Sequence, residues 1–116
     1  MSGVRGYIFS RPFMGERVPQ HVQNLVIRDY CKNKSIQYLL SATEYAMAGS
    51  HFILQQILDE LSQLEGIVFY SLFLLPEQKK ERDRVCKVIL DNKKTIFFAV
   101  EGLLMSNKIE YERIET

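Results

Sequence analysis

The stretch Ile67-Val68-Phe69-Tyr70-Ser71-Leu72-Phe73 is apolar on both of the faces that a strand presents. Such continuous apolarity predicts a strand in the middle of a parallel sheet, because helices cover a central strand on both sides. The preceding Gly66 predicts the end of a helix, since glycine is common just after a helix C-terminus. We therefore expect a buried sheet between helical layers.

The segments on both sides of this stretch alternate between strand and helix patterns. In chain order, we expect a strand at 4–10, a helix at 19–34, a strand at 36–41, a loop at 42–49, a helix at 50–64, a strand at 67–73, a helix at 76–94, a strand at 95–100 and a strand at 108–114. Pro19, Ser50 and Pro76 suit the starts of their helices. The whole chain, residues 1–116, is expected to form one domain.

This alternation predicts an α/β fold with three α/β/α layers and a five-stranded, mostly parallel sheet. Right-handed crossovers favour the strand order 2-1-3-4-5, as in flavodoxin-like sheets. The segment 108–114 alternates polar and apolar residues, which is typical of a half-exposed edge strand. Because only the short segment 101–107 precedes it, we expect this last strand to run antiparallel.

The composition is that of an ordinary globular domain and excludes several classes of protein. Among 116 residues, Lys and Arg number 15 and Asp and Glu number 14, so no long-range attraction to nucleic acid or an anionic membrane is expected. The most apolar stretch, 66–75, is about half the length of a membrane helix, and the N-terminus lacks a signal-peptide pattern. Cys31 and Cys86 lie in helical patterns, which predicts buried free thiols and a reducing, cytoplasmic location.

Polar side chains are concentrated where the predicted strands end. In open parallel sheets, ligands bind outside the carboxyl ends of the strands where the strand order reverses, which here is between strands one and three. The candidates at that rim are Ser10, Arg11, Arg17, Gln23, Asn24, Glu44, Tyr45, Ser71 and Glu101. Their convergence from separate parts of the sequence predicts a small-molecule site.

Two arginines and two carboxylates define the chemistry expected at this rim. Arg11 and Arg17 suit an anion such as a phosphate, or they pair with surface glutamates. Glu44 and Glu101 suit a general acid and base pair, with Ser10 beside them, or they are solvated loop carboxylates.

The remaining candidates are binding groups. Tyr45 suits a phenolic donor or a ring that stacks on a sugar, or it covers the edge of the core, and Ser71 suits the orientation of a ligand hydroxyl. Gln23 and Asn24 either face the rim or form a solvated stripe. The two histidines stand thirty residues apart without acidic partners, so no metal is expected. The glycine-rich signatures of dinucleotide and ATP sites are absent, so we expect no cofactor.

Four segments carry a resemblance to a known family. The runs GYIFSRP (6–12), QNLVIRDYC (23–31), LSATEYAM (40–47) and YSLFLLP (70–76) resemble the sporadic carbohydrate cluster protein family over most of the chain. Members of that family are encoded among bacterial genes for surface polysaccharide and unusual-sugar synthesis. The resemblance implies a process, carbohydrate biosynthesis, without defining a reaction.

A more distant resemblance is to the catalytic domain of serine recombinases, the resolvase and invertase fold, over residues 6–104. Gly6-Tyr7 matches the start of its first strand, and Gln23 matches a glutamine of its first helix. The recombinase pattern Tyr-x-Arg-x-Ser is broken, because Phe9 stands in place of its arginine and Arg11 in place of its serine. The resemblance therefore implies a resolvase-like sheet without recombinase chemistry.

These observations leave three functional alternatives open. The first is a cytoplasmic protein that binds a sugar or sugar phosphate and, if it is an enzyme, transforms it by acid/base chemistry. The second is a non-catalytic scaffold or partner of a biosynthetic enzyme, with a loop-borne apolar patch of Phe13, Met14, Met47, Leu103, Leu104 and Met105. The third is a resolvase-like nucleic-acid module. A homo-oligomer is expected in each case, since so short a chain has little material to enclose a ligand.

Overall fold

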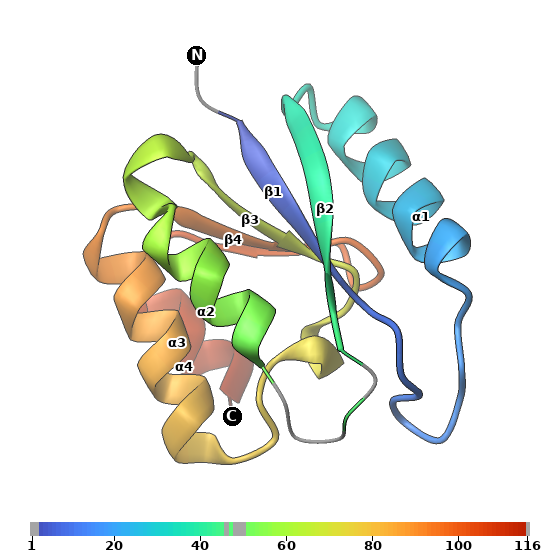
Figure 1. The fold of residues 1–116 in the computed structure, drawn as a ribbon. Coiled ribbons are helices and arrows are strands. Elements are labelled where there is room, and N and C mark those ends of the chain that lie inside the picture. The colour runs from blue at the N-terminus through green and yellow to red at the C-terminus, as the bar shows by residue number, and fades with distance from the viewer. Residues whose placement is uncertain (1–2, 46, 48–50, 116) are drawn as a thin grey trace.

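The computed structural model describes residues 3–45, 47 and 51–115. Its strands and helices alternate along most of the chain (Figure 1). They are β1 (Val4–Phe9), α1 (Gln20–Asn33), β2 (Tyr38–Glu44), α2 (Phe52–Asp59), β3 (Gly66–Phe69), α3 (Lys79–Asp91), β4 (Thr95–Phe98), β5 (Leu103–Met105) and α4 (Lys108–Glu115). Two short 3-10 helices, η1 (Leu61–Gln63) and η2 (Leu72–Leu74), follow α2 and β3.

The five strands form one sheet in the order β2-β1-β3-β4-β5, and β5 alone is antiparallel to its neighbour. This confirms the predicted α/β sheet, its strand order and its antiparallel last strand. Gly66 does not end a helix, as its position suggested, but begins β3. A Cβ atom there would lie 2.1 Å from the carbonyl oxygen of Thr95, so close contact with β4 explains the glycine.

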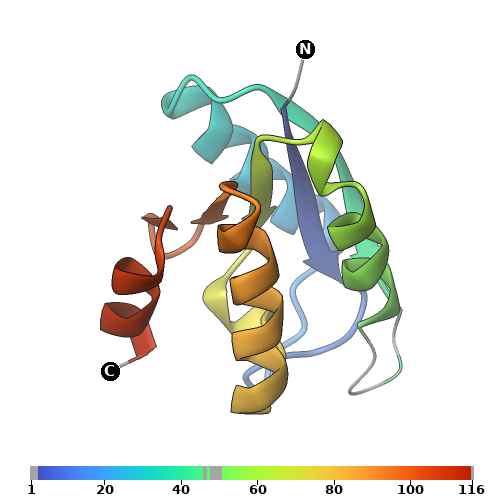
Figure 2. The ribbon, with the colours of Figure 1, turned by 90° about the vertical axis from the view of Figure 1, so that its left-hand side faces the viewer.

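Helices cover both faces of the sheet, which confirms the three-layer arrangement. On one face, α1 packs Ile27, Tyr30 and Cys31 against β1 and β3. On the other face, α2, α3 and α4 pack against the larger part of the core. Figures 1 and 2 show α1 on one side of the sheet and the other three helices side by side on the opposite side.

Strands β2 and β3 end at other positions than the sequence predicted. β2 continues to Glu44, because Thr43 and Glu44 pair with the last residues of β1. Glu44 therefore lies in a strand and not in a loop. β3 ends at Phe69, and Ser71 begins η2 by accepting a hydrogen bond from the backbone N–H of Phe73 at 3.2 Å. The predicted helix cap at Ser50 lies outside the described residues.

The fifth strand lies in the segment that was expected to be a connecting loop. Leu103–Met105 pairs with β4, so that Met105 lies opposite Ile96. The connection between the two strands is only four residues long, which suits antiparallel neighbours. The predicted edge strand at 108–114 was therefore wrong in place, although its direction was right.

The segment 108–114 is helical, and side chains cap its first turn. The side chain of Asn107 accepts from the backbone N–H of Glu110 at 3.0 Å, and the carboxylate of Glu110 accepts from the N–H of Ser106 at 2.7 Å. These two hydrogen bonds satisfy one backbone donor in the first turn of α4 and one just before it. Tyr111 and Ile114, three residues apart, then face the core.

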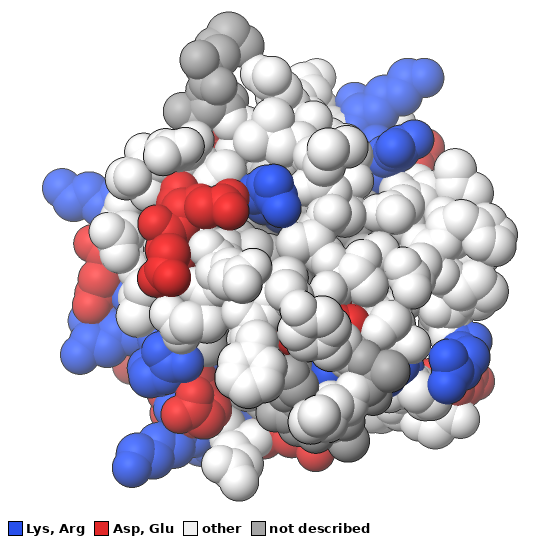
Figure 3. Space-filling view, in the orientation of Figure 1, with Lys and Arg blue, Asp and Glu red and all other residues white. Residues whose placement is uncertain are grey.

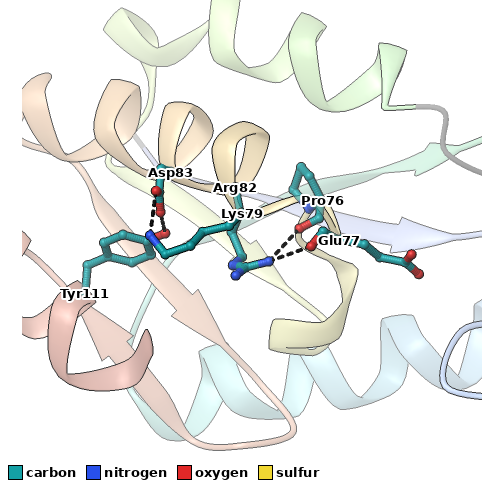
Figure 4. A network of polar contacts seen from close by, with 6 residues as sticks. All are labelled: Pro76, Glu77, Lys79, Arg82, Asp83 and Tyr111. Carbon is teal, nitrogen blue, oxygen red and sulfur yellow. Dashed lines mark hydrogen bonds and ion pairs between the residues drawn. The ribbon is translucent and has the colours of Figure 1, made fainter. Parts of the chain in front are cut away.

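A polar network attaches α4 to α3 (Figure 4). The hydroxyl of Tyr111 donates a hydrogen bond to the carboxylate of Asp83, which also receives the ammonium of Lys79 at 2.8 Å. These hydrogen bonds, that from Lys79 above all, lower the pKa of Asp83 below its usual value. The last helix is thus held by a partly exposed carboxylate as well as by apolar packing.

The two cysteines are buried free thiols, as predicted. Burial raises the pKa of the Cys31 thiol to about 11. Among the described residues, no helix combines the length and the apolar character that crossing a bilayer requires.

Candidate functional site

Glu44 occupies the centre of a buried polar cluster at the ends of β1 and β2. Its carboxylate is fully buried and accepts the hydroxyl of Tyr7 at 2.8 Å. It also accepts the backbone N–H groups of Ile53 and Leu54, each at 3.1 Å. The first N–H groups of a helix have no partner within the helix, and its N-terminus favours a negative charge. Glu44 therefore caps α2 from a neighbouring strand.

The hydroxyl of Tyr7 stays protonated and donates its hydrogen bond to Glu44. Burial first, and then the hydrogen bond to Glu44, raise the pKa of its hydroxyl far above the usual value. The ring packs edge-on against Phe9 and Phe69, so the hydroxyl is held in place by the core.

Arg11 is almost completely buried and is engaged by the segment that follows β2. Its Nη1 atom donates to the carbonyl oxygens of Tyr45 at 3.0 Å and Met47 at 3.1 Å. Its guanidinium carbon lies 4.0 Å from the centre of the Phe9 ring, and its Nη2 atom lies 3.5 Å from Nε2 of His51. Arg11 thus holds the backbone of Tyr45 and Met47 near the end of β1, and its predicted anion binding stays a prediction.

Ser10 and Arg17 also lie at the end of β1. The hydroxyl of Ser10 donates to the backbone carbonyl of Glu44 at 2.7 Å. The exposed Arg17 reaches the backbone carbonyl of Ser10 at 3.4 Å. The structure therefore brings Ser10, Arg11, Arg17 and Glu44 together, as the sequence predicted.

Gln23 is fully buried and completes the backbone pairing at the end of β1. Its amide group accepts from the N–H of Phe9 at 3.0 Å and donates to the carbonyls of Phe9 and Val18 at 2.9 Å. Asn24 accepts the hydroxyl of Tyr38 at 3.4 Å. Both side chains connect α1 to the sheet.

Ser71 and Glu101 form a second cluster at the ends of β3 and β4. The hydroxyl of Ser71 donates to one carboxylate oxygen of Glu101 at 2.7 Å, and the backbone N–H of Leu72 donates to the other at 3.0 Å. Glu101 thus holds the start of η2 as Glu44 holds the start of α2. The described partners of the two carboxylates differ, and an acid/base role for the pair stays a prediction.

A groove of about 730 Å³ opens between α2 and α3, beside the buried Glu44 cluster. It is bounded by the segments that follow β1 and β3, so it lies at the reversal point of the strand order, where the sequence placed the site. Its apolar lining includes four aromatic rings and four aliphatic side chains, namely Phe9, Phe13, Phe52, Phe73, Leu54, Leu58, Leu75 and Val85.

Charged and amide side chains stand among the apolar ones. Arg84 of α3 contacts Glu81 at 3.1 Å and also reaches the amide oxygen of Gln55 on α2 at 3.3 Å. Arg82 donates to the backbone carbonyls of Pro76 at 3.2 Å and Glu77 at 2.8 Å, which fixes the segment at the edge of the groove (Figure 4). The groove thus offers both hydrogen-bonding groups and apolar surface to a ligand.

The groove lies at the rim that the sequence favoured, although few of its lining residues were predicted. Of the nine predicted rim residues, Arg11 alone is among those that line the groove. Phe52 and Phe73 are 66% and 48% exposed, although their sequence contexts resemble those of core positions. The exposure of these two rings, near the starts of α2 and η2, is what marks them as groove residues. The apolar pattern of the sequence does not separate exposed phenylalanines from buried ones.

The predicted loop-borne apolar patch is not one surface. Phe13 and Met14 line the groove, whereas Leu103 and Leu104 lie on β5 at the far edge of the sheet, and Met105 is completely buried. Within the described part of the chain, no three His, Cys, Asp or Glu side chains are grouped as a metal ion would require.

Comparison with known proteins identifies the fold alone. A scan against protein-family models found no match, and a search of curated proteins found none either. The solved N-terminal catalytic domain of TP901-1 integrase aligns with a TM-score of 0.73 and 15% identity, over 96% of this chain and 88% of that chain. This similarity supports the resolvase-like fold expected from the sequence.

Proposed function

We propose that this protein binds a sugar or sugar phosphate intermediate of bacterial surface-carbohydrate biosynthesis in the groove between α2 and α3. The observation that carries the proposal is the position of the groove, at the carboxyl ends of β1 and β3. Its volume of about 730 Å³ falls within the range of ligand sites, about 300 to 1,000 Å³.

The lining suits a ligand with an apolar face and several hydroxyl groups. Aromatic rings such as Phe73 offer flat surfaces for the C–H face of a sugar ring. Glu77, Gln78 and Gln55 offer acceptors and donors for its hydroxyl groups. Arg84 offers a guanidinium for a phosphate or carboxylate.

The choice of a carbohydrate rests on the sequence. The segments 6–12 and 70–76, which border the groove, are among those that resemble the sporadic carbohydrate cluster protein family. That resemblance favours a sugar over other ligands of similar size, and a cytoplasmic place in the synthesis of surface carbohydrates.

The proposal concerns binding and not turnover. Glu44 is fully buried beneath its donors, and Glu101 is held by Ser71 and Leu72. A catalytic role for Glu44, Glu101 or Ser10 requires a change in these contacts, and acid/base chemistry stays a prediction.

The test is calorimetric titration of the protein with nucleotide sugars, sugar phosphates and neutral sugars. We expect at least one phosphorylated sugar to bind. Phe73→Ala should weaken its affinity about tenfold, since the loss of one stacked ring costs about 1.4 kcal/mol. Arg84→Ala should weaken phosphorylated sugars more than their neutral counterparts.

Two variants outside the groove are matched controls. Ile109→Ala removes a side chain that is 65% exposed on α4, and Arg28→Ala removes an arginine of α1. Both should leave the affinity unchanged. If no sugar binds, or if the groove variants and the controls behave alike, the proposal is wrong.

A second candidate is a docking site for a partner enzyme of the same pathway. The observation in its favour is that Met14, Phe52 and Phe73 expose large apolar surfaces at one groove. Isolation of the protein from cells that express the whole gene cluster should then yield a stoichiometric partner. Phe73→Ala should release that partner, while the sugar panel shows no binding.

A further inference from the structure

Strand β2 is an outer edge of the sheet and is longer than the opposite edge strand. It contains seven residues, Tyr38–Glu44, and in the described sheet it pairs with β1 alone. The other edge, β5, contains three residues. Natural proteins keep edge strands short, or place proline or charged residues such as lysine on them, because the exposed backbone groups of an edge pair with other strands.

β2 lacks the charged side chains that usually protect an edge. Its sequence Tyr-Leu-Leu-Ser-Ala-Thr-Glu has one charged residue, Glu44, whose carboxylate faces inward to cap α2. Leu40 is 72% exposed on this strand. Figure 3 shows that the surface over β2 and the front of α1 is formed largely by uncharged residues.

The outward-facing backbone groups of β2 follow from its pairing with β1. The carbonyl of Glu44 accepts the N–H of Ser10, so Glu44 faces β1. Successive residues of a strand direct their N–H and C=O groups to opposite sides, so Ala42 also faces β1, while Ser41 and Thr43 face outward. Two donors and two acceptors are therefore presented along the regular part of the edge.

We infer that β2 pairs antiparallel with β2 of a second copy of this chain, which joins the two sheets into one. In the register that uses every outward group, Ser41 of each copy lies opposite Thr43 of the other, and Ala42 lies opposite its own counterpart on the two-fold axis. Directly opposed residues without mutual hydrogen bonds approach to a Cα separation of about 4.5 Å, which suits a side chain as small as alanine.

Charge and burial both favour this occupant. The edge meets an identical edge across the axis, and it exposes no like charges that would repel each other. Leu39 and Leu40 together lie opposite Arg5, so they form a bulge in β2. Pairing with a second copy places Leu40 near the partner strand and removes its apolar surface from water.

Two variants test the pairing by measurement of mass in solution, with sedimentation or light scattering. Thr43→Pro removes an outward N–H and leaves the bonds to β1, because proline is tolerated where its nitrogen faces away from the sheet. Leu40→Lys places a charge on the edge. We expect the unaltered protein to be a dimer and both variants to be monomers with unchanged circular dichroism.

Leu25→Lys is the matched control, since it adds the same charge to an exposed leucine of α1. It should remain a dimer. A monomeric unaltered protein, or a dimer that survives Leu40→Lys, overturns the inference. A chain that is monomeric alone and pairs only with a different protein overturns it as well.

A cross-link tests the register. Ala42→Cys places two thiols near each other on the axis, and the buried Cys31 and Cys86 do not compete for the oxidant. Mild oxidation should give a covalent dimer of Ala42→Cys, but not of Leu25→Cys. If the two variants cross-link equally, or if neither does, the proposed register is wrong.

Discussion

The molecule contains the same polar contact in two environments. Tyr7 donates its hydroxyl to Glu44 between β1 and β2, and Tyr111 donates its hydroxyl to Asp83 between α4 and α3. The carboxylate of Glu44 is completely buried, whereas the side chain of Asp83 is 40% exposed. Each cluster is accompanied by a cation. The buried Arg11 lies near the Glu44 cluster, and the exposed Lys79 binds Asp83.

The difference shows what burial does to a hydrogen bond. When water is excluded, every donor and acceptor must find a protein partner, and the loss of one leaves its partner unsatisfied. At the surface, water replaces a lost partner, so a contact of the same chemistry contributes little. The Glu44 cluster should therefore set the stability of the fold, and the Asp83 cluster should affect mainly the docking of α4.

The largest effect is expected from Glu44→Ala. This change leaves the hydroxyl of Tyr7 and the first N–H groups of α2 without their buried acceptor. We expect the free energy of unfolding to fall by about 3 kcal/mol or more. Urea denaturation followed by circular dichroism measures it. A loss within about 0.5 kcal/mol, typical of surface substitutions, would contradict the assigned role.

A smaller loss is expected from Tyr7→Phe. The ring and its packing against Phe9 and Phe69 remain, and Glu44 keeps its backbone donors. Only one buried hydrogen bond is lost, which costs about 1 to 1.5 kcal/mol. The same urea titration measures it, with Tyr38→Phe at the partly buried Tyr38 as the control for removal of a hydroxyl. Equal losses in the two variants would show that burial does not distinguish them.

The Glu44 cluster also shows how far sequence reasoning reaches. The positions of Ser10, Arg11 and Glu44 at the ends of two strands predict correctly that they meet. Their partners are not predictable from position, because β2 continues past its expected end and directs Glu44 toward α2. A strand end that is displaced by three residues changes an expected loop carboxylate into a buried helix cap.

The fold was more predictable than the site because its signals are repeated along the chain. The apolar run that contains β3 and the alternation of strands with helices define the sheet order without any exact boundary. The missed α4 had a local signal, the spacing of Asn107 and Glu110, but the polar and apolar alternation of 108–114 also fits a strand. Two patterns compete there, and the capping residues favour the helix that the structure shows.

Tyr111→Phe is the exposed counterpart of Tyr7→Phe. Asp83 retains Lys79 as a partner, and water can reach the site. The loss of stability should therefore be smaller than that of Tyr7→Phe, and the N–H groups of α4 should exchange with solvent faster while those of the sheet do not. Hydrogen exchange measured by NMR separates the two. A loss of stability equal to that of Tyr7→Phe would remove the distinction between the clusters.

The smallest effect should be a pH dependence confined to α4. Hydrogen bonds from Lys79 and Tyr111 lower the pKa of Asp83 below the ordinary value of 3.8. The contribution of Asp83 is therefore fully present above about pH 3.8 and is lost as the pH falls through its lower value in the folded protein. The protection of the α4 amides, relative to the exchange rate of an unstructured chain at the same pH, should fall in that acid range and should fall less at high salt, which screens the Lys79 pair. Asp83→Asn should abolish the pH dependence, and its persistence in that variant would assign it to another group.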